Sequence, residues 1–447
     1  MTALAPTSMT PASIDPADPV ALTQALVRCR SVTPADDGAL GVVETALAAL
    51  GFTTERMPFS EAPVSGQPAT PDIDNLYARR GSSGPTLCFA GHTDVVPPGD
   101  PAAWSSPPFD AAIRDGVLFG RGAVDMKGAI ACFIAATARH LGKRPDASGS
   151  IAFLITGDEE GPSINGTVKM LDALKARGER LDACLVGEPS NPHALGDEIK
   201  IGRRGSLNVE LTVHGIQGHA AYPEKARNPV PQLVHMLDRL SRTPLDSGTP
   251  HFQASNLEVT VIDVPNTATN VIPAVARAKF NVRYNDLHSR ALIEDWVHTQ
   301  CAAAAKNLKG EAETPGVAYD LAFSGTGEVF RTAPVPGTPS ADLVGTLRAA
   351  VHAVTGRTPA LTTGGGTSDA RFIHSHCPVV EFGLVNATIH KVDECVPVAD
   401  LEALTQIYER FIAAFLPPRC EGRTARLVLL SSEPSELERL ERRQDRL

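Results

Sequence analysis

Apolar residues outside the middle of the chain form short continuous runs that are separated by segments of helical periodicity. Runs without alternation are typical of strands that are covered on both faces, so the pattern predicts an α/β layer architecture with a buried sheet. The apolar runs predict strands at 86–90, 151–156, 183–186 and 379–384. Helical periodicity predicts helices at 20–30, 39–50, 128–141, 164–175, 341–355 and 401–415.

The middle of the chain has a different pattern, because three segments there alternate apolar and polar residues. These segments are 207–215, 257–263 and 274–284, and helices are predicted at 231–240 and 291–305. Alternation predicts a half-exposed antiparallel sheet, hence an α+β domain at 206–317 inserted into a main domain of residues 19–205 and 318–418. Residues 1–18 are predicted to be a loose leader and 419–447 a charged tail.

The composition narrows the class of protein. The net charge is −10, from 41 basic and 51 acidic residues, which argues against a partner of duplex nucleic acid. No apolar run approaches the roughly 18 residues that span a bilayer, and no secretory signal is visible. The eight cysteines are scattered without a C-x-x-C pair. We therefore expect a soluble cytoplasmic protein with no membrane partner.

Five apolar runs each lead to a side chain that can bind a metal. Because ligands bind beyond the carboxyl ends of strands in open α/β sheets, we expect these side chains to converge. One metal ligand from each run gives two imidazoles and three carboxylates, a set that suits zinc, and less tightly cobalt or manganese. Five ligands suit two ions that share a carboxylate and a water. The candidate side chains are His92 with Asp94, Asp125, Asp158 with Glu159 and Glu160, Glu188, and His390.

Two of these segments suggest roles beyond ligation. Asp94 lies two residues after His92, where a carboxylate could orient the imidazole. Neighbouring side chains of an extended segment point in opposite directions, so one of Glu159 and Glu160 could bind metal while the other acts as a general base. Each motif alone also fits an ordinary alternative: surface hydrogen bonding, a solvated acidic pair, a turn at Gly-Glu-Pro, or a helix N-cap at Asp125. Their joint occurrence favours a metal site.

The ordered set of motifs resembles a known family. The segments GHTDVVPPGD, GRGAVDMKGAIA, TGDEEG, VGEPS and NATIH resemble the di-zinc amidohydrolases, which include aminoacylases, acetylornithine deacetylases and carboxypeptidase-type enzymes. Within this group, IGRRGS, NVIP, FNVRY, GGTSDARF and NATIHKVDECV are most similar to the succinyl-diaminopimelate desuccinylases. The resemblance covers about residues 20 to 416, and Ala370 stands where the family commonly has glycine.

The resemblance implies a zinc-peptidase-like catalytic domain, with a mixed sheet between helices, interrupted by an inserted α+β dimerisation domain. It also implies a homodimer with two Zn²⁺ per subunit, for which Co²⁺ or Mn²⁺ could substitute. Asp125 would bridge the two ions. His92 and Glu188 would complete one site, and Glu160 and His390 would complete the other.

The resemblance further implies catalytic and substrate-binding residues. Glu159 would be the general base, Asp94 would support catalysis, and His219 in GIQGHAAYP would reach the partner subunit's site. Without the resemblance, the favoured interpretation of His219 is a polar loop histidine, because Gly215, Gly218 and Pro223 surround it. The implied substrate-binding residues are Arg203, Asn270, Arg283, Gly366, Thr367 and Ser368. From sequence alone, the arginines fit salt bridges at a domain hinge as well as they fit a substrate, and the other residues fit a tight turn.

The implied reaction is hydrolysis of N-succinyl-LL-2,6-diaminopimelate to succinate and LL-2,6-diaminopimelate, in lysine and diaminopimelate biosynthesis. The substrate would be a small N-acyl dicarboxylic amino acid, which arginine side chains recognise well. Three alternatives remain open at this point. They are an acetylornithine deacetylase or other N-acyl amino acid amidohydrolase, a non-catalytic metal-binding relative, and a structural protein whose carboxylates are merely solvated.

Overall fold

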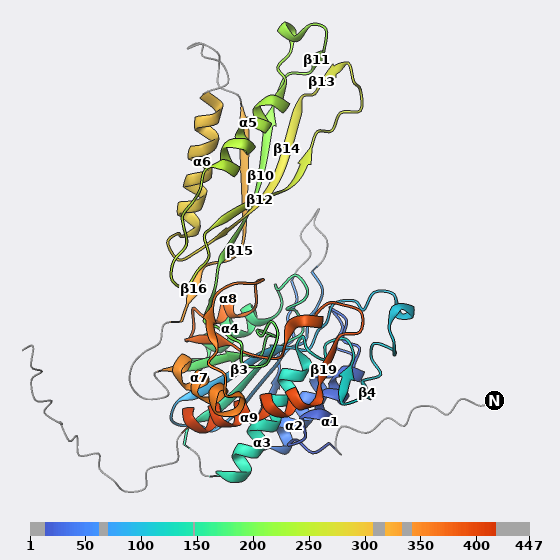
Figure 1. The fold of residues 1–447 in the computed structure, drawn as a ribbon, viewed down its shortest axis with the longest axis vertical. Coiled ribbons are helices and arrows are strands. Elements are labelled where there is room, and N and C mark those ends of the chain that lie inside the picture. The colour runs from blue at the N-terminus through green and yellow to red at the C-terminus, as the bar shows by residue number, and fades with distance from the viewer. Residues whose placement is uncertain (1–13, 62–69, 146–147, 307–317, 333–341, 417–447) are drawn as a thin grey trace, which may run out of the picture.

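The computed structural model of the chain describes residues 14–61, 70–145, 148–306, 318–332 and 342–416. The molecule consists of a broad base and a long arm that extends from it (Figure 1). We call the described residues between 205 and 327 the arm and the remaining described residues the base. The predicted tail, 419–447, lies outside the described residues, as do residues 1–13 of the predicted leader.

The base is built on one mixed sheet of eight strands. Its four middle strands run parallel, so their carboxyl ends meet at one edge. The outer strands β2 and β8 pair antiparallel with their inner neighbours. In sheet order the strands are β1 (Thr53–Arg56), β2 (Leu76–Arg80), β6 (Ser150–Thr156), β3 (Thr86–His92), β7 (Ala183–Val186), β18 (Val379–Glu381), β8 (Glu198–Lys200) and β17 (Ala360–Thr362).

Helices cover both faces of this sheet. Leu87 and Phe89 of β3 point into one hydrophobic core, and Cys88 and Ala90 point into another on the opposite face. This double burial explains the apolar runs without alternation, and the mixed α/β class is as expected. The first core includes α1 (Pro19–Arg28), α2 (Ala39–Ala49), α3 (Lys127–Lys143), α7 (Leu343–Thr355) and α9 (Val398–Phe415), and the second includes α4 (Thr167–Ala176) and α8 (Ala370–Ile373).

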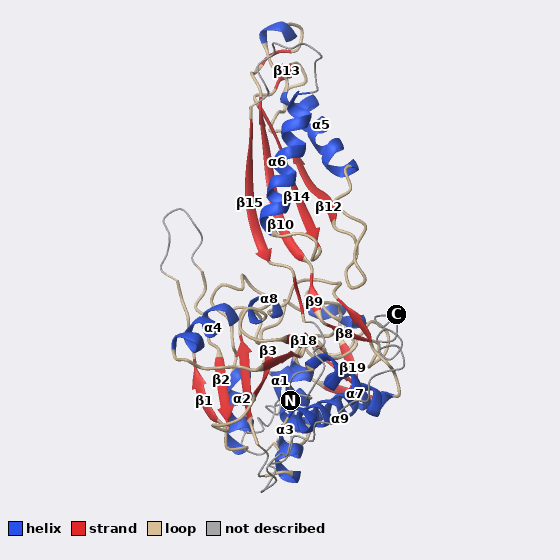
Figure 2. Cartoon of the chain, turned by 90° about the vertical axis from the view of Figure 1, so that its left-hand side faces the viewer, coloured by secondary structure: helices blue, strands red, loops and turns tan. Residues whose placement is uncertain are grey.

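The arm is an antiparallel sheet with two helices on one face (Figure 2). Alternate residues of each inner strand, such as Leu207 and Val209, face α5 and α6, which produces the alternation in the sequence. In sheet order the strands are β12 (Asn256–Asp263), β14 (Val275–Tyr284), β10 (Gly205–His214) and β15 (Tyr319–Gly327); the helices are α5 (Pro229–Arg242) and α6 (Arg290–Lys306). At the far end of the arm, β11 (Gly218–His219) pairs with β13 (Val271–Ile272).

Smaller elements complete the fold. The chain passes between base and arm through β9 (Gly202–Arg203) and β16 (Phe330–Arg331), which pair with each other. A small sheet joins β4 (Ala112–Arg114), β5 (Val117–Phe119) and β19 (Cys395–Pro397). Single 3₁₀ turns are formed by Pro101–Ala103, Pro223–Lys225 and Asn386–Thr388.

The structure corrects three sequence-based boundaries. Strand β15 pairs with β10 from Tyr319 onward, so the inserted unit ends near Gly327 and the predicted end at 317 is too early. The predicted strand at 379–384 ends at Glu381. The end of the predicted leader is ordered, because Asp18 caps α1 and Ile14 packs against the base core. Among the described residues, no helix is both long and apolar enough to cross a membrane.

Candidate metal centre

The parallel strands deliver four of the predicted side chains to one edge of the base sheet. His92 is the last residue of β3, Glu159 and Glu160 follow β6, and Glu188 follows β7. Asp125 is placed by a different part of the fold. The apolar run that precedes it forms β5 of the small sheet, and Asp125 itself lies in the loop before α3. We expected each of these side chains to follow the carboxyl end of a strand in one sheet. That expectation is wrong for Asp125, which joins the cluster from a loop beside the small sheet.

The side chains form two overlapping groups. His92, Asp125 and Glu188 make one group, and Asp125, Glu160 and His390 make the other; within each, one ligand atom per residue lies within 4.8 Å of the others. His92 Nε2 is 3.2 Å from Asp125 Oδ1 and 3.7 Å from Glu188 Oε1. His390 Nε2 is 3.4 Å from Asp125 Oδ2 and 2.8 Å from Glu160 Oε1. Each Asp125 oxygen thus faces a different group, as a bridging carboxylate requires.

Charge and burial make this cluster unusual. Burial alone would lower the pKa of His92, but the hydrogen bond with Asp125 and the negative charge of Glu188 raise it well above its ordinary value. Hydrogen bonds with Asp125 and Glu160 raise the pKa of His390 to about 10. Burial and the Asp125 charge raise the pKa of Glu188. Crowded carboxylates and imidazoles of this kind suit divalent cations, which neutralise the acids and displace the imidazole protons.

Asp94 lies beside His92 but acts differently from the prediction. His92 Nδ1 contacts the main-chain oxygen of Asp94 at 2.9 Å, whereas the carboxylate oxygen Oδ1 is 3.6 Å away. The Asp94 carboxylate instead accepts hydrogen bonds from the backbone N–H groups of Glu160, at 2.9 Å, and Glu159, at 3.3 Å. Asp94 therefore orients the imidazole mainly through its backbone and fixes the acidic pair through its side chain.

Glu159 lines a cleft of about 630 Å³ next to the cluster. No described residue donates a hydrogen bond to its carboxylate, and burial raises the pKa of this group to about 8. Asp158 has a structural role, since its carboxylate accepts hydrogen bonds from the backbone N–H groups of Ile164 and Asn165. The cleft is lined by Glu159, Glu160, Gly161, Pro162, Ser163, Gly325, Gly366, Thr367, Arg371 and Phe372.

Of the six predicted substrate-binding residues, four are not among the residues that line this cleft: Arg203, Ser368, Asn270 and Arg283. Arg203 is buried and forms an ion pair with Glu381, to which Ser368 also donates a hydrogen bond of 2.8 Å. Arg203 Nη1 donates to the main-chain oxygen of Gly366 at 2.8 Å. The salt-bridge alternative therefore describes Arg203, and its contact with the glycine turn supports the wall of the cleft. Gly366 and Thr367 line the cleft directly.

Three arginines near the cleft or at the base of the arm, Arg204, Arg283 and Arg371, form no ion pair with another described residue. Arg283 lies at the base end of β14, and among the described residues neither it nor the neighbouring Arg204 has an acidic partner within ion-pair distance. Arg371 lines the cleft and lies over the ring of Phe372, 4.6 Å from its centroid. The sequence analysis missed Arg371, although a cation inside the GGTSDARF motif was a signal for it.

His219 and Asn270 lie far from the cluster of their own chain. His219 belongs to β11 and Asn270 directly precedes β13, both at the distal end of the arm in Figure 1. The main-chain oxygen of Asn270 accepts a hydrogen bond from Ala220, which joins the two segments. A single chain therefore does not bring these two residues to the metal ligands.

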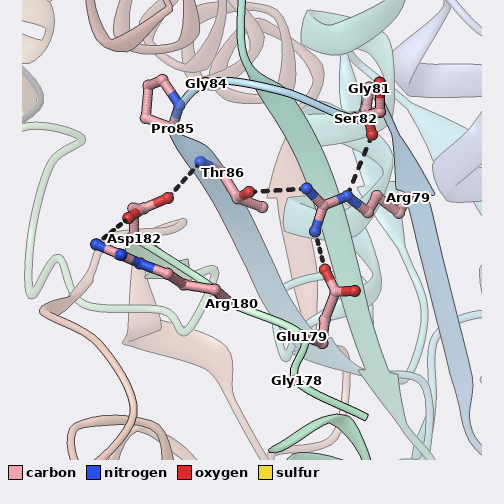
Figure 3. A pocket seen from close by; sticks show the side chains of 10 residues that line it. All are labelled: Arg79, Gly81, Ser82, Gly84, Pro85, Thr86, Gly178, Glu179, Arg180 and Asp182. Carbon is pink, nitrogen blue, oxygen red and sulfur yellow. Dashed lines mark hydrogen bonds and ion pairs between the residues drawn. The ribbon is translucent and has the colours of Figure 1, made fainter.

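A second polar cleft lies at the opposite, amino-terminal edge of the strands (Figure 3). Arg79 is paired with Glu179, and Arg180 with Asp182 at 3.0 Å. Asp182 also accepts a hydrogen bond of 2.9 Å from the backbone of Thr86. These charges satisfy one another, so this cleft has the character of a structural ion-pair network, and the Asp125 cluster is the candidate functional site.

Both the sequence and the fold are similar to those of known proteins. A family model described as peptidase family M20/M25/M40 matches residues 88–414. Aminopeptidase PepT from Bacillus cereus is similar with a TM-score of 0.67 and 21% identity, over 90% of this chain and 100% of that chain. The metallo-carboxypeptidase Sso-CP2 from Sulfolobus solfataricus gives 0.65 and 18%, over 89% and 99%.

Another similar structure belongs to a protein that binds metal. The YXEP protein of Bacillus subtilis, a dinuclear metal binding peptidase from the M20 family, gives a TM-score of 0.62 and 14% identity, over 90% of this chain and 98% of that chain. At such identities the structural likeness establishes the fold. The family match spans more than half of the sequence, and the chain therefore belongs to peptidase family M20/M25/M40.

Proposed function

We propose that this protein hydrolyses N-succinyl-LL-2,6-diaminopimelate to succinate and LL-2,6-diaminopimelate, as a cytoplasmic di-zinc enzyme. One observation carries the proposal: two ligand groups share Asp125, and Glu159 lines the cleft beside them. Within the M20 family, the motifs around this site resemble the desuccinylases most, which is why we choose this substrate over other amides.

The donor set fits two divalent cations. His92 and Glu188 would hold one, Glu160 and His390 the other, and Asp125 both. Imidazole nitrogen with carboxylate oxygen is a ligand set for zinc, and it also accepts Co²⁺ or Mn²⁺. When bound, such a pair of cations supplies positive charge that activates a water and polarises the scissile carbonyl.

Glu159 would move the proton. Its carboxylate lies in the cleft beside Glu160 and is not held by a hydrogen bond from any described residue, so it can accept a proton from the attacking water. The same carboxyl can then donate that proton to the leaving amine, because burial favours the protonated form. Asp94 fixes the backbone of Glu159 and so sets where this carboxylate points.

Substrate selection would depend on Arg371, on Arg283 and on the turn that contains Gly366 and Thr367. Arg371 is positively charged and lies in the cleft, where a substrate carboxylate could bind its guanidinium. Thr367 and Gly366 lie beside it and could donate further hydrogen bonds. Arg283 lies at the base of the arm and has no acidic partner among the described residues, so we propose that it binds a carboxylate when arm and base close on the substrate.

His219 would act in the partner subunit of a homodimer. Its Nδ1 accepts a hydrogen bond of 3.0 Å from the backbone of Ala221, which leaves the proton on Nε2, the nitrogen that could donate to an oxyanion. Because this ring lies at the tip of the arm, a second copy of the chain is the simplest way to bring it to a cleft. Asn270 would reach the substrate by the same route.

The outer surface of the arm supports this dimerisation role. Strand β12 is an edge strand, and Val261 and Ile262 on it are 44% and 61% exposed. Val234 on the neighbouring α5 is 56% exposed. An exposed apolar edge strand is a ready pairing surface, so we propose that two arms associate along β12 and α5.

A substrate panel tests the proposal. Zinc-loaded protein should hydrolyse N-succinyl-LL-2,6-diaminopimelate with a higher kcat/KM than N-acetylornithine, other N-acyl amino acids or dipeptides. Ninhydrin detection of released amine measures all of these substrates in one assay. Faster turnover of N-acetylornithine would contradict the assigned acyl group and favour the acetylornithine deacetylase alternative. Absence of hydrolysis with every substrate would contradict the amidohydrolase function.

A further inference from the structure

Glu394 is a buried carboxylate that lies four residues after His390 and is 0% exposed. It accepts four hydrogen bonds, all from the segment that leads to Asp125. One oxygen accepts from the guanidinium of Arg121 at 2.8 Å and from the backbone of Gly122 at 3.0 Å. The other accepts from the backbone N–H groups of Val124, at 2.9 Å, and Asp125, at 3.1 Å.

These contacts curl the Gly120–Asp125 loop around one side chain. The main-chain oxygen of Glu394 also accepts a hydrogen bond of 2.9 Å from Gly120, at the start of the loop. Gly122 adopts a φ of +82°, a conformation that glycine reaches without strain. Because the N–H of Asp125 is itself bonded to Glu394, the position of the Asp125 backbone, and hence of its side chain, depends on this carboxylate.

Glu394 also connects the two segments that carry neighbouring ligands. It lies next to β19, which pairs with β5 through Cys395 and Phe119. His390, four residues earlier, contacts the Asp125 carboxylate. Arg121, which compensates the Glu394 charge, is itself buried and lies over the ring of Trp104, 5.3 Å from its centroid. The Glu394 carboxylate is therefore hydrogen-bonded and charge-compensated by the segment that ends at Asp125, while its own backbone belongs to the segment that carries His390.

We infer that Glu394 is a positioning residue of the metal centre: its carboxylate holds the Gly120–Asp125 loop so that each oxygen of Asp125 faces one ligand group before any cation binds. The inference rests on the proposed metal centre, but not on the choice of substrate. Partners that orient metal ligands typically change metal affinity or activity by about 10–100-fold when they are removed. Since Asp125 belongs to both groups, loss of Glu394 should weaken both metal sites.

The first test compares Glu394→Gln with Glu179→Gln in the full-length protein. Glu179 is a matched control, because it is also paired with an arginine (Figure 3) but precedes β7, at the opposite edge of the sheet from the metal ligands. Calorimetric titration of the metal-free proteins with Zn²⁺ should show about 10–100-fold weaker binding for Glu394→Gln and wild-type binding for the control. The kcat of the loaded variant should fall by a similar factor, while KM changes little, because Glu394 does not line the cleft. Wild-type Zn²⁺ affinity in Glu394→Gln would overturn the inference.

The second test uses the wild-type protein, so it remains informative if Glu394→Gln does not fold. Hydrogen exchange of the metal-free protein should show the amides of Gly122, Val124 and Asp125 protected, relative to the turn at Asp115 and Gly116. Fast exchange that becomes slow only after Zn²⁺ is added would overturn the inference. A wild-type protein that binds two cations but hydrolyses no substrate would contradict the proposed function alone. Wild-type protein that binds no cation would contradict both.

Discussion

His390 Nε2 lies 2.8 Å from Glu160 Oε1, although 230 residues separate them in the sequence. The contact joins the loop after β18 to the loop after β6, two strands that are not neighbours in the sheet order β6-β3-β7-β18. Half of the candidate metal centre therefore exists only when the C-terminal part of the base is folded against the N-terminal part. The ring of His390 is also the most exposed of the five ligands, with 49% of its side chain accessible.

Because Asp125 belongs to both ligand groups, its replacement should lower the zinc content more than replacement of a ligand that belongs to one group. Asp125→Ala removes a ligand from both groups, so we expect a protein that binds little or no zinc. His390→Ala removes a ligand from one group only, so we expect about one zinc per chain, at the His92 and Glu188 side. Metal analysis after dialysis against equal zinc concentrations measures both. Equal losses in the two variants would show that the two groups do not share Asp125.

Glu159→Ala should separate metal binding from catalysis. The carboxylate belongs to neither ligand group, so the zinc content should stay near that of the wild type. Turnover should fall by roughly 10²–10⁴-fold, because proton transfer to and from a positioned side chain contributes that much. Glu160→Ala is the informative comparison, since it should lose both metal and activity. Retained turnover in Glu159→Ala would refute the assigned base.

His219→Ala tests whether the arm acts on a partner subunit. We expect kcat to fall by roughly 10²-fold if the ring stabilises an oxyanion. His214→Ala is a matched control, because His214 is a partly exposed arm histidine that pairs with Asp320. Mixed dimers of His219→Ala with Glu159→Ala should regain part of the activity, since one of the two sites in each dimer is then complete. No recovery in verified mixed dimers would exclude action in trans.

Removal of metal should lower stability as well as activity. Without cations, the carboxylates of Asp125, Glu160 and Glu188 crowd together with only the imidazoles to offset their charge. Each cation bound to the folded state at 100 times its Kd adds about 2.7 kcal/mol to the free energy of unfolding. We expect chelation to lower Tm by several degrees and abolish turnover, and Zn²⁺ or Co²⁺ to restore both. An unchanged Tm after verified loss of metal would contradict a bound dinuclear centre.

We expect the Asp246 carboxylate, at the base of the arm, to contribute to the free energy of unfolding in a pH-dependent way. Burial alone raises its pKa, but hydrogen bonds from Ser255, Gly248 and His288 outweigh burial and lower it to about 2. A carboxyl whose pKa is depressed in the folded state stabilises the protein above the unfolded-state pKa, near 4, and loses this contribution as the pH falls toward 2. Asp246→Asn should therefore lower the free energy of unfolding by on the order of 2 kcal/mol at pH 7. The difference from the wild type, measured by denaturant unfolding, should shrink between pH 4 and pH 2. A constant difference over that range would contradict the assigned pKa.

Local pattern was sufficient to predict most of the secondary structure. Strand β7 was predicted at its observed residues, and β3 and β6 to within two residues, because each is buried on both faces and reads as an unbroken apolar run. The arm strands β10 and β14 were recognised from alternation, since one face of their sheet is covered by helices. Strand β15 was missed because its place in the sheet depends on pairing with β10, which lies more than 100 residues earlier.

For the candidate site, the sequence by itself indicated that His92, Glu160 and Glu188 lie close together, because residues that follow buried parallel strands lie at one edge of the sheet. Only the tertiary structure decided what each one faces. In the folded protein Arg203 contacts Glu381, and the Asp94 carboxylate contacts the backbone of Glu159 and Glu160. A guanidinium or carboxylate has several possible partners of similar strength, so its choice depends on distances that form only when remote segments pack together.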